Sequence, residues 1–419
     1  MAYSTLGCAM SAIGRVGRAV TRAALVSAVG LVPGVARAQA PDQSAPLVFQ
    51  SISAGTNHAC GITPQHVAYC WGRNVEGQLG NASMTSACSD VGTPCSAKPV
   101  RVEGGLSFAV ISAGNNFTCG VTTVGTAYCW GTGTQGQLGT GDQASSSSPQ
   151  RVQAEGVPFL TISAGFSHAC AVARTGAAYC WGSNAGGRLG TGTLTGGHTS
   201  PALVAGGLAF RTISAGYYHT CGVTRSGTAY CWGRNDQGEL GSGATGAHGS
   251  PTRVGGALAA RIVSAGVQFD YTCAVGRDST LSCWGANCYG QLGTDSTTEQ
   301  CGSPAMPCST TPKAVHATGA IEDVSAFFSH VCALSASGQV TCWGQNDQGQ
   351  LGNGDESGSA TAPTPVAGGA TYRAVTTGRQ FSCAIAEDGT ARCWGRNADG
   401  QLGVGDARIH ATPTPVVGP

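Results

Sequence analysis

Apolar and polar positions follow a single pattern that repeats along the chain. The stretch from Ile213 to Gly243 reads ISAGYYHTCGVTRSGTAYCWGRNDQGELGSG, and it is one of seven near-copies that recur every 51 residues with small variations. A fixed period of roughly 40 to 50 residues is typical of a solenoid or a propeller built from one repeated unit. All seven tryptophans occur in the same Cys-Trp-Gly triplet of this unit, at Trp71, Trp130, Trp181, Trp232, Trp284, Trp343 and Trp394.

Each copy predicts four short strands. In the fourth copy the first strand begins with the segment 213–216, the second covers 219–224 and the third covers 228–232. Only Arg225-Ser226-Gly227 separates the second from the third, and such a loop fits a type I turn followed by a left-handed glycine. A fourth strand of the form Pro-x-x-Val follows an Asn-x-x-Gly-Gln-Leu-Gly loop. Seven such copies predict an all-β, seven-bladed β-propeller with four-stranded antiparallel blades.

The same Cys-x9-Cys spacing occurs in every copy. If Thr224 faces Thr228 across the turn, Cys221 lies opposite Cys231 at a non-hydrogen-bonded position, where Cα atoms approach to about 4.5 Å. A disulfide can bridge that distance. Zinc or redox chemistry is the alternative, but the spacing matches neither and one hairpin supplies only two ligands. We therefore predict one disulfide per blade: Cys60–Cys70, Cys119–Cys129, Cys170–Cys180, Cys221–Cys231, Cys273–Cys283, Cys332–Cys342 and Cys383–Cys393.

Copies one and five are eight residues longer than most, and both insertions carry Cys-x6-Cys. We predict the disulfides Cys88–Cys95 and Cys301–Cys308, which leave Cys288 odd. The alternative pairs Cys288 with Cys301 or Cys308, and either arrangement leaves a free thiol. A loop that is already ordered loses less entropy on binding, so tied loops suit a recognition surface. Protease resistance of a secreted loop is the competing explanation.

The repeated pattern resembles the regulator of chromosome condensation (RCC1) repeat. The shared features are His, then Thr or Ser, an apolar pair, a Gly turn, Tyr, Trp-Gly and Asn-x-x-Gly-Gln-Leu-Gly, and they cover roughly 49–417. Departures are local: His66 and Ser279 replace the turn glycine, and Phe327 stands where Gly is expected. The resemblance implies the same propeller fold. Together with the N-terminal export signal described next, it makes the chain resemble a secreted bacterial member of the family.

The N-terminal segment differs in composition from the rest. Arg15, Arg18 and Arg22 precede an apolar run from Ala23 to Val35, and Ala36-Arg37-Ala38 supplies a cleavage site, which is the layout of a secretory signal peptide. Translation could start at Met1 or Met10. We predict a signal peptide at 1–38, a lead-in at 39–48 and the propeller at 49–419.

Export agrees with the cysteine content, because disulfides persist in oxidising compartments. No later run approaches the 18 or so continuous apolar residues that a membrane span requires. We expect a monomer without a membrane span, secreted or held in the periplasm or at the cell surface after cleavage near Ala38.

Charge argues against a nucleic-acid partner. The chain has 22 basic and 21 acidic residues, and removing the four arginines of 1–38 leaves 18 against 21, or about −3. No basic stripe exists to neutralise a phosphate backbone. The chromatin role associated with the family is therefore disfavoured.

Two recurring residue types invite a chemical interpretation. Histidine precedes the first cysteine in four copies, and Phe117, Tyr271 and Phe381 replace it in the others. A ring of histidines suggests metal binding, but aromatic replacements favour a structural, hydrogen-bonded role. Light sensing by clustered tryptophans occurs in the family, but here the repeat uses every tryptophan, and we expect them to be buried between blades. The histidines are His58, His168, His219 and His330.

No catalytic motif is present: the chain has no G-x-S-x-G, H-E-x-x-H or phosphate-cradling loop. We predict no catalytic residues, no cofactor and no metal. Specificity should lie in what differs among the copies, since folding occupies the shared residues. The long variable loops hold few aromatic side chains, so better anchors lie near the second turn. These partner-binding candidates are Phe166, Tyr217, Tyr218, Tyr289, Phe327, Phe328 and Arg379.

These features predict a non-catalytic secreted protein that recognises another macromolecule through one propeller face. A protein partner is the first expectation and a glycan the alternative, although the aromatic content of 6% weighs against a glycan. A secreted inhibitor of a β-lactamase or a protease is a sharper form, based on a family member with that role. Guanine-nucleotide exchange on a small GTPase is disfavoured, because export removes the partner.

Overall fold

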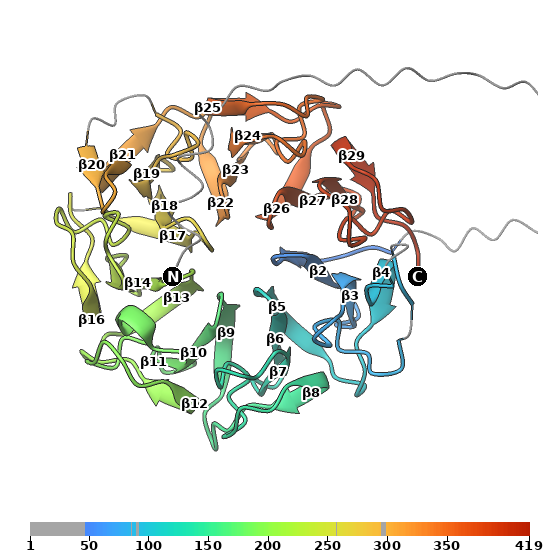
Figure 1. The fold of residues 1–419 in the computed structure, drawn as a ribbon, viewed down its shortest axis with the longest axis horizontal. Coiled ribbons are helices and arrows are strands. Elements are labelled where there is room, and N and C mark those ends of the chain that lie inside the picture. The colour runs from blue at the N-terminus through green and yellow to red at the C-terminus, as the bar shows by residue number, and fades with distance from the viewer. Residues whose placement is uncertain (1–46, 85, 89–91, 257, 295–298) are drawn as a thin grey trace, which may run out of the picture.

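Seven antiparallel sheets surround a central axis (Figure 1). The computed structural model describes residues 47–84, 86–88, 92–256, 258–294 and 299–419. Each sheet is built from strands that are consecutive in the sequence. The predicted seven-bladed propeller is therefore confirmed. The predicted signal peptide and most of the predicted lead-in lie outside the described residues.

The first four blades each contain four strands, ordered from the axis outward. Blade 1 consists of β1 (Ser51–Ala54), β2 (His58–Ile62), β3 (Ala68–Arg73) and β4 (Cys95–Arg101). Blade 2 consists of β5 (Phe108–Ala113), β6 (Phe117–Thr122), β7 (Ala127–Gly131) and β8 (Ser146–Arg151). Blade 3 consists of β9 (Phe159–Ala164), β10 (His168–Ala173), β11 (Ala178–Gly182) and β12 (His198–Leu203), with the short 3-10 helix η2 (Ala185–Gly187) before β12. Blade 4 consists of β13 (Phe210–Ala215), β14 (His219–Thr224), β15 (Ala229–Gly233) and β16 (His248–Arg253).

The last three blades include the exception to the four-stranded pattern. Blade 5 consists of β17 (Ala260–Ala265), β18 (Tyr271–Gly276), β19 (Leu281–Ala286), β20 (Glu299–Cys301) and β21 (Met306–Val315). Blade 6 consists of β22 (Ile321–Phe327), β23 (His330–Ser335), β24 (Val340–Gln345) and β25 (Ser359–Pro365). Blade 7 consists of β26 (Tyr372–Thr377), β27 (Phe381–Ala386), β28 (Ala391–Gly395) and β29 (His410–Pro415).

Blade 5 differs because its insertion folds into a hairpin. The order in this sheet is β17-β18-β19-β21-β20, so β20 adds a fifth strand at the outer edge. Cys301 lies opposite Met306 across this hairpin, and Cys301 is bonded to Cys308. The expectation of four strands in every blade is therefore wrong for blade 5. The extra residues give the chain enough length to double back.

The strand register places the two repeated cysteines of each blade face to face. In blade 4, Cys221 pairs with Cys231, and their Cα atoms are 4.1 Å apart. All seven predicted blade disulfides are present, and so are Cys88–Cys95 and Cys301–Cys308. At the two turns without glycine, His66 and Ser279 adopt φ values of 62° and 63°. These side chains accept the left-handed conformation that glycine takes elsewhere.

A hydroxyl group on each inner strand links one blade to the next. The amide of Ala113 in β5 donates to Ser53 Oγ in β1 over 3.0 Å, and the equivalent bond occurs at every junction. At the last junction the amide of Ala54 donates to Thr376 Oγ1 over 3.1 Å. The Ile-Ser-Ala-Gly segment therefore closes a complete ring of inter-blade hydrogen bonds.

The tryptophans fill the interfaces between blades, as expected, and all seven are fully buried. Trp130 Nε1 donates to the carbonyl of Gln78 over 2.9 Å, and equivalent bonds fix five more tryptophans. Trp71 is the exception, since its Nε1 has no hydrogen-bond partner among the described residues.

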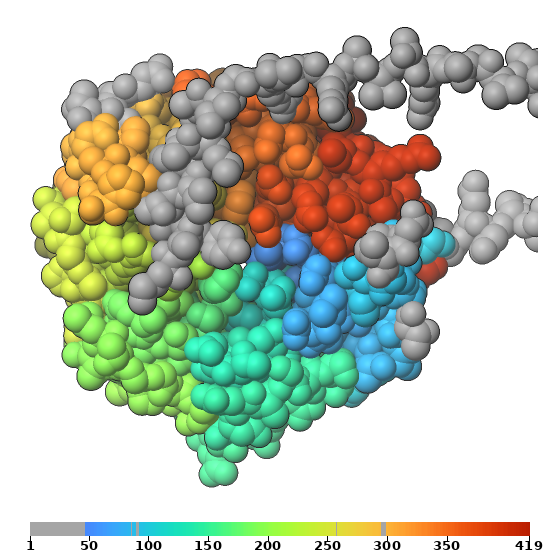
Figure 2. Space-filling model, in the orientation of Figure 1, coloured from blue at the N-terminus to red at the C-terminus, as the bar shows by residue number. Residues whose placement is uncertain are grey.

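Blade 7 meets blade 1 without exchanging a strand (Figure 1). Figure 2 shows the two blades side by side, blade 7 in red and blade 1 in blue. Blade 7 is complete with β26 to β29. A single bridge between Val48 and Thr390 and a hydrogen bond from the Phe49 amide to the Gly389 carbonyl connect the two ends of the propeller.

Candidate functional site

One face of the propeller carries both the short inner loops and the long variable loops. Because the strands of a blade alternate in direction, the loop after the first strand and the loop after the third strand open on the same face. We call this the rim face, and the loops between first and second strands the rim loops. The rim loops are 55–57, 114–116, 165–167, 216–218, 266–270, 328–329 and 378–380.

Backbone hydrogen bonds connect neighbouring rim loops. The amide of Phe166 donates to the carbonyl of Gly216, and the amide of Tyr217 donates to the carbonyl of Gly266, each over 3.2 Å. The same connection links blade 7 to blade 1, from the Arg379 amide to the Gly55 carbonyl. The rim loops thus form a connected belt, which holds their side chains at fixed spacing.

The predicted partner-binding residues lie on this belt or next to it, since Tyr289 is in the loop after β19 and Phe327 ends β22. Phe166 contacts Tyr217 with ring centroids 4.1 Å apart, and Tyr217 contacts Tyr218 at 4.2 Å. Phe269 connects the next members, with its ring 5.4 Å from Tyr289 and 5.0 Å from Phe328. The guanidinium of Arg379 lies 5.1 Å from the Phe328 ring centroid. We call these residues together with Phe327 the rim patch. It runs from blade 3 to blade 7.

Exposure separates the members of the rim patch. Phe327 and Phe328 are only 6% and 8% exposed and pack against Val267 in a small hydrophobic cluster. The other predicted anchors, Phe166, Tyr217, Tyr218, Tyr289 and Arg379, are half-buried. The two buried phenylalanines therefore support the surface, and the half-buried side chains form it.

Backbone strain is concentrated at the same loops. Five residues other than glycine have positive φ among the described residues, and three of them, Gln268, Phe328 and Gln380, belong to rim loops of consecutive blades. Their φ values are 94°, 50° and 61°. Left-handed conformations at side chains other than glycine cost roughly 1–3 kcal/mol and cluster at functional sites.

Arg188 holds the aromatic part of the rim patch in place. Its side chain is 1% exposed, and its Nη1 donates to Ser167 Oγ over 2.9 Å and to the Tyr217 carbonyl over 2.8 Å. The guanidinium also lies 4.4 Å from the Tyr218 ring centroid. Burial lowers the pKa of Arg188 to about 10, so it stays charged at neutral pH. A buried cation thus ties the rim loops of blades 3 and 4 together.

Two carboxyl groups are buried in blades 4 and 5, and one of them, Asp270, interacts electrostatically with Arg188. Burial raises the pKa of Asp270 to about 6, and Asp236 adds to the rise while Arg234 opposes it. Burial also raises the pKa of Glu239 well above its usual range, with a further contribution from Asp270. Glu239 Oε2 accepts a hydrogen bond from the Gln237 amide over 2.8 Å. Blades 4 and 5 therefore share an unusual set of buried acids.

A pocket of about 520 Å³ opens between blades 4 and 5. Asp270, Phe269 and Gln268 contribute from the rim loop of blade 5. On the opposite side Arg234 contacts Asp236 over 2.5 Å and lies 3.9 Å from Asp270 Oδ2. The β20–β21 hairpin, fixed by Cys301–Cys308, supplies Gly302, Ser303 and Met306 to the lining. The tied loop of blade 5 thus forms a wall of the pocket.

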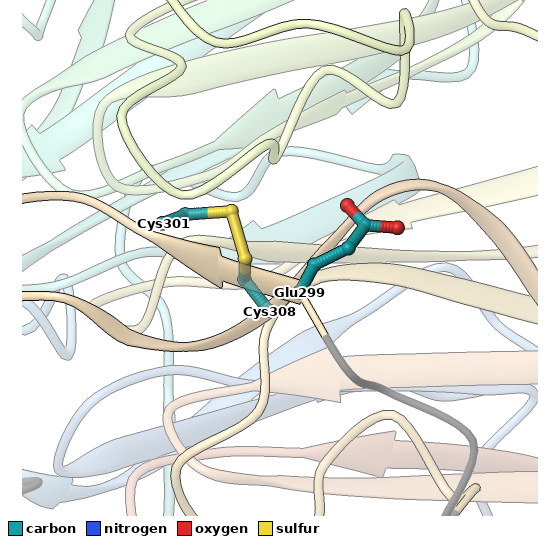
Figure 3. A group of neighbouring side chains, drawn as sticks. All are labelled: Glu299, Cys301 and Cys308. Atoms are coloured by element: carbon teal, nitrogen blue, oxygen red, sulfur yellow. A yellow bond between two sulfur atoms is a disulfide. The ribbon is translucent and has the colours of Figure 1, made fainter.

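The same hairpin contains a cluster of potential metal ligands, shown in Figure 3. Cys301 and Cys308 form a disulfide, and such sulfur atoms are not the thiolates that bind metals. The Glu299 carboxylate accepts hydrogen bonds from the amide and hydroxyl of Thr310 and lies 3.6 Å from Lys313 Nζ. The oxidised hairpin therefore uses all three residues for its own structure.

Cys288 is also disulfide-bonded, and none of the described cysteines is free. Its Sγ lies 3.8 Å from Met306 Sδ at the pocket. The prediction that Cys288 leaves a free thiol is therefore wrong.

The repeated histidines hold blades together, as expected from their aromatic replacements. His58 Nε2 lies 2.9 Å from Thr118 Oγ1, and that hydroxyl donates to the Gln78 carbonyl. The hydroxyl therefore accepts from His58 Nε2–H, which fixes the tautomer. Burial lowers the pKa of His58 to about 3, so the ring is neutral. The equivalent pairs are His168–Thr220, His219–Thr272 and His330–Ser382.

The sequence also contains a signal for the hydroxyl partner of each histidine, which the sequence analysis did not use. Where a blade has Phe instead of His, at Phe117 and Phe381, the next blade has alanine at the hydroxyl position, Ala169 and Ala59. Tyr271 instead bonds to the backbone of the next blade, donating to the His330 carbonyl over 2.8 Å. Comparing each copy with the next one along the chain shows that the two positions change together: His occurs with Thr or Ser, and Phe occurs with Ala.

Arg188 and Glu239 were also missed. They occupy the Gln position of the Asn-x-x-Gly-Gln-Leu-Gly loop, which is glutamine in the other five copies. Gln78 uses its side-chain oxygen to accept the amide of Glu76, as Glu239 does with Gln237. The signal was present: two adjacent copies replace one neutral residue with opposite charges.

These features define a disulfide-stapled repeat propeller with an aromatic and charged rim face. The model of the RCC1-like domain matches residues 5–308, and models of the regulator of chromosome condensation (RCC1) repeat match 321–350, 372–401 and 337–385. The chain is 30% identical over 308 residues to the ultraviolet-B receptor UVR8 of Arabidopsis thaliana, covering 73% of this chain and 67% of the receptor. The chain belongs to the RCC1-like family.

Other relatives share only the propeller. The human E3 ubiquitin-protein ligase HERC2 is 30% identical over 365 residues, which cover 82% of this chain but 7% of the ligase. Human WBSCR16 has a TM-score of 0.72 at 21% identity, with 84% of this chain and 94% of that chain covered. Prp20p from Saccharomyces cerevisiae has a TM-score of 0.72 at 20% identity, with 85% and 87% covered. The two solved structures show the common fold.

In the part of the chain that the structure describes, no helix has the length and apolar character needed to cross a bilayer.

Proposed function

We propose that this chain is an exported, non-catalytic binding protein that recognises a protein partner through its rim face. The observation that carries the proposal is the rim patch: residues from five blades form two groups of aromatic contacts, one of which ends at Arg379, and both groups pack on one buried cluster of Val267, Phe327 and Phe328. Tyr and Arg are the residue types enriched among strong interface anchors. Their supports, the buried Arg188 and the strained rim loops, pre-order the surface and reduce the entropy lost on binding.

The relatives support a protein partner. The structure of Prp20p was described together with its binding to Gsp1p and histones. A ligase such as HERC2 contains the propeller as a small part of its length, so its activity does not transfer with the fold. We therefore place this chain among the members whose propeller binds.

Export is the second part of the proposal. It rests on the N-terminal signal-peptide pattern and on nine disulfides between described residues. So many disulfides are typical of the periplasm or the extracellular space. Nucleotide exchange on a cytosolic GTPase is disfavoured under this proposal, because export separates the two proteins.

A secreted bacterial inhibitor of a β-lactamase or a protease is the most specific form of the proposal. It requires the same exposed face and the same lack of catalysis. Inhibition assays against a panel of these enzymes test it directly. A glycan ligand is the competing outcome, and binding to a glycan array would favour it.

The experiment that tests the proposal is affinity capture of envelope and culture-fluid proteins on residues 39–419 produced in an oxidising compartment. The variant carries Phe166→Ala and Tyr217→Ala, and the matched control carries Asn115→Ala and Asn116→Ala at the equivalent blade 2 loop. We expect the first variant to lose at least about tenfold in affinity and the control to bind normally. Equal binding by both variants contradicts the proposal. So does turnover of a wall or glycan substrate that a point mutation abolishes.

A further inference from the structure

The pocket between blades 4 and 5 contains buried acceptor atoms without partners. Asp270 is 4% exposed and lines the pocket, yet its Oδ1 accepts no hydrogen bond from any described residue. Gln237 is 5% exposed and also lines the pocket, and its Oε1 is likewise without a partner there. A buried acceptor that stays unpaired costs roughly 1–3 kcal/mol, and a charged one costs more. These oxygen atoms are suited to a ligand that brings hydrogen-bond donors.

The charges of the lining favour a cation. Among the residues that line the pocket, Asp236 and Asp270 face one guanidinium, that of Arg234, which lies against Asp236 and over the Tyr218 ring at 5.2 Å. The buried Arg188 also acts on Asp270 electrostatically but does not line the pocket. Arg234 reaches only Oδ2 of Asp270, at 3.9 Å, so Oδ1 remains available. The pKa of Asp270, raised by burial to about 6, leaves it ionised at neutral pH. The lining itself therefore carries two carboxylates and one guanidinium.

The remaining walls suit the stem of a long side chain. Phe269 offers an aromatic ring, and Met306 offers an apolar thioether. Cations bind over aromatic rings, and alkyl stems pack on apolar surface. The volume of about 520 Å³ lies within the range of small-ligand sites, which is roughly 300–1,000 Å³.

The walls are held rigid. A Cβ atom placed on Gly302 at the hairpin tip would lie 2.1 Å from Gln237 Nε2, so the tip packs directly on that side chain. The Cys301–Cys308 disulfide fixes the same hairpin. Gln268, with a φ of 94°, is constrained on the rim-loop side.

We infer that this pocket receives the ammonium or guanidinium group of a lysine or arginine side chain that the partner protein inserts between blades 4 and 5. The inference rests on the proposed function. Phe269 belongs to both the pocket and the rim patch, contacting Tyr289 and Phe328, so a partner lying on the patch reaches the pocket. Asp270 Oδ1 accepts a hydrogen bond from the cationic group, and Phe269 packs against the alkyl stem of the inserted side chain.

The chain offers a direct reporter for the test. It contains four methionines, and residues 39–419 retain only Met84 and Met306. Met306 lines the pocket, whereas Met84 packs in blade 1. A sample labelled with 13C at the methionine methyl groups therefore gives one signal from the site and one internal control.

The labelled chain is titrated with N-acetyl-lysinamide and N-acetyl-argininamide, and with the neutral analogues N-acetyl-norleucinamide and N-acetyl-citrullinamide. We expect the cationic probes to shift the Met306 signal saturably, with a dissociation constant of roughly millimolar size for so small a probe, and to leave Met84 unchanged. Asp270→Asn should weaken this binding at least about tenfold, and Asp355→Asn, at an exposed acid of blade 6, should not change it.

A second variant keeps the test independent of the buried aspartate. Thr245 is exposed and lines the pocket, so Thr245→Trp should fill it and abolish the Met306 response without disturbing the core. The inference is overturned if neutral and cationic probes act alike, if neither moves Met306, or if both variants still respond. If these probes fail but the capture experiment succeeds, only the pocket assignment falls. If Met306 responds but no protein is captured, the proposed function falls instead.

Discussion

Blade 3 meets its two neighbours in different ways. At the junction with blade 2, Phe117 faces the next blade at the position of Ala169, and the loop carries the usual glutamine, Gln137. At the junction with blade 4, His168 bonds to Thr220 over 2.8 Å, and Arg188 replaces the glutamine. Both junctions share the same strand register and the same hydrogen bond from the next tryptophan. An apolar contact at one junction and a hydrogen bond at the other therefore occupy the same place between blades.

The two junctions differ in two kinds of substitution: one kind keeps the packing between blades intact, and the other is not needed for that packing. Phe with Ala and His with Thr are alternative solutions to one packing problem, because both members of the pair change together. The packing between blades does not require Arg188, since glutamine occupies the equivalent position in five other copies. Burying a guanidinium is costly unless it is well paired. We interpret Arg188 as serving the rim patch, whose Tyr217 and Tyr218 it contacts.

The largest predicted effect is a loss of stability in acid at the histidine junctions. Burial lowers the pKa of His58, His219 and His330 to about 3, and that of His168 well below 6.5. Because the unfolded chain takes up these protons first, the stabilisation is complete above pH 6.5 and is lost as the pH falls towards 3. At about pH 5 each histidine should cost about 2 kcal/mol. Urea unfolding at about pH 7.5 and pH 5 measures this loss.

Three carboxyl groups oppose this acid effect, because burial also raises the pKa of Glu239 well above its usual range. The pKa values of Asp270 and Asp323 are raised by burial to about 6, so their contribution is present at low pH and is lost as the pH rises through 6. Four histidines outweigh three carboxyl groups, and the net stability should fall. Converting the junction of blades 3 and 4 with His168→Phe and Thr220→Ala should remove about a quarter of the histidine effect. A chain equally stable at both pH values contradicts the prediction.

The second effect concerns what the two junctions share. Replacing both cysteines of one blade disulfide by alanine should lower the free energy of unfolding by about 3 kcal/mol, because each closes a loop of about 11 residues. The Cys119–Cys129 and Cys170–Cys180 bridges have equal Cα separations of 4.1 Å, so both double variants should lose the same amount. Urea unfolding under oxidising conditions compares them. Clearly unequal losses would show that the disulfides, too, depend on the junction type.

A third prediction tests the paired exchange. Thr220→Ala alone leaves His168 Nε2 buried without an acceptor and should cost about 1–3 kcal/mol. Adding His168→Phe reproduces the Phe–Ala combination of the blade 2 junction and should recover most of the loss. The coupling energy from the double-mutant cycle measures the pair. Additive losses in the double variant would show that the two positions are independent.

The repeat made most of the fold predictable. Copies with equal spacing identified the blades, and the three-residue turn fixed the register that pairs Cys221 with Cys231. The extra strand β20 was not predictable, because an insertion does not reveal whether it folds back. Most of the partner-binding residues lie together because they share one place in the repeat, whereas Tyr289, in the loop after β19, reaches them through its contact with Phe269. The acids of the pocket were missed, because Asp270 lies in a copy with two extra residues and only the fold brings it near Arg234.

The smallest predicted effect on stability carries the most information about function. Arg188→Gln restores the repeat residue, whose side-chain oxygen can accept the amide of Gly186 as Gln137 accepts the amide of Gln135. Removing a buried charge offsets the lost hydrogen bonds to Ser167 and the Tyr217 carbonyl, so unfolding should change by less than about 1 kcal/mol. Partner capture should nevertheless weaken severalfold, because Tyr217 and Tyr218 lose the group that orders them. Gln137→Ala is the control: it removes a hydrogen bond at a junction without the rim patch and should leave capture intact. If Arg188→Gln reduces stability and leaves capture unchanged, Arg188 belongs to the fold, and the contrast between the two junctions of blade 3 carries no functional meaning.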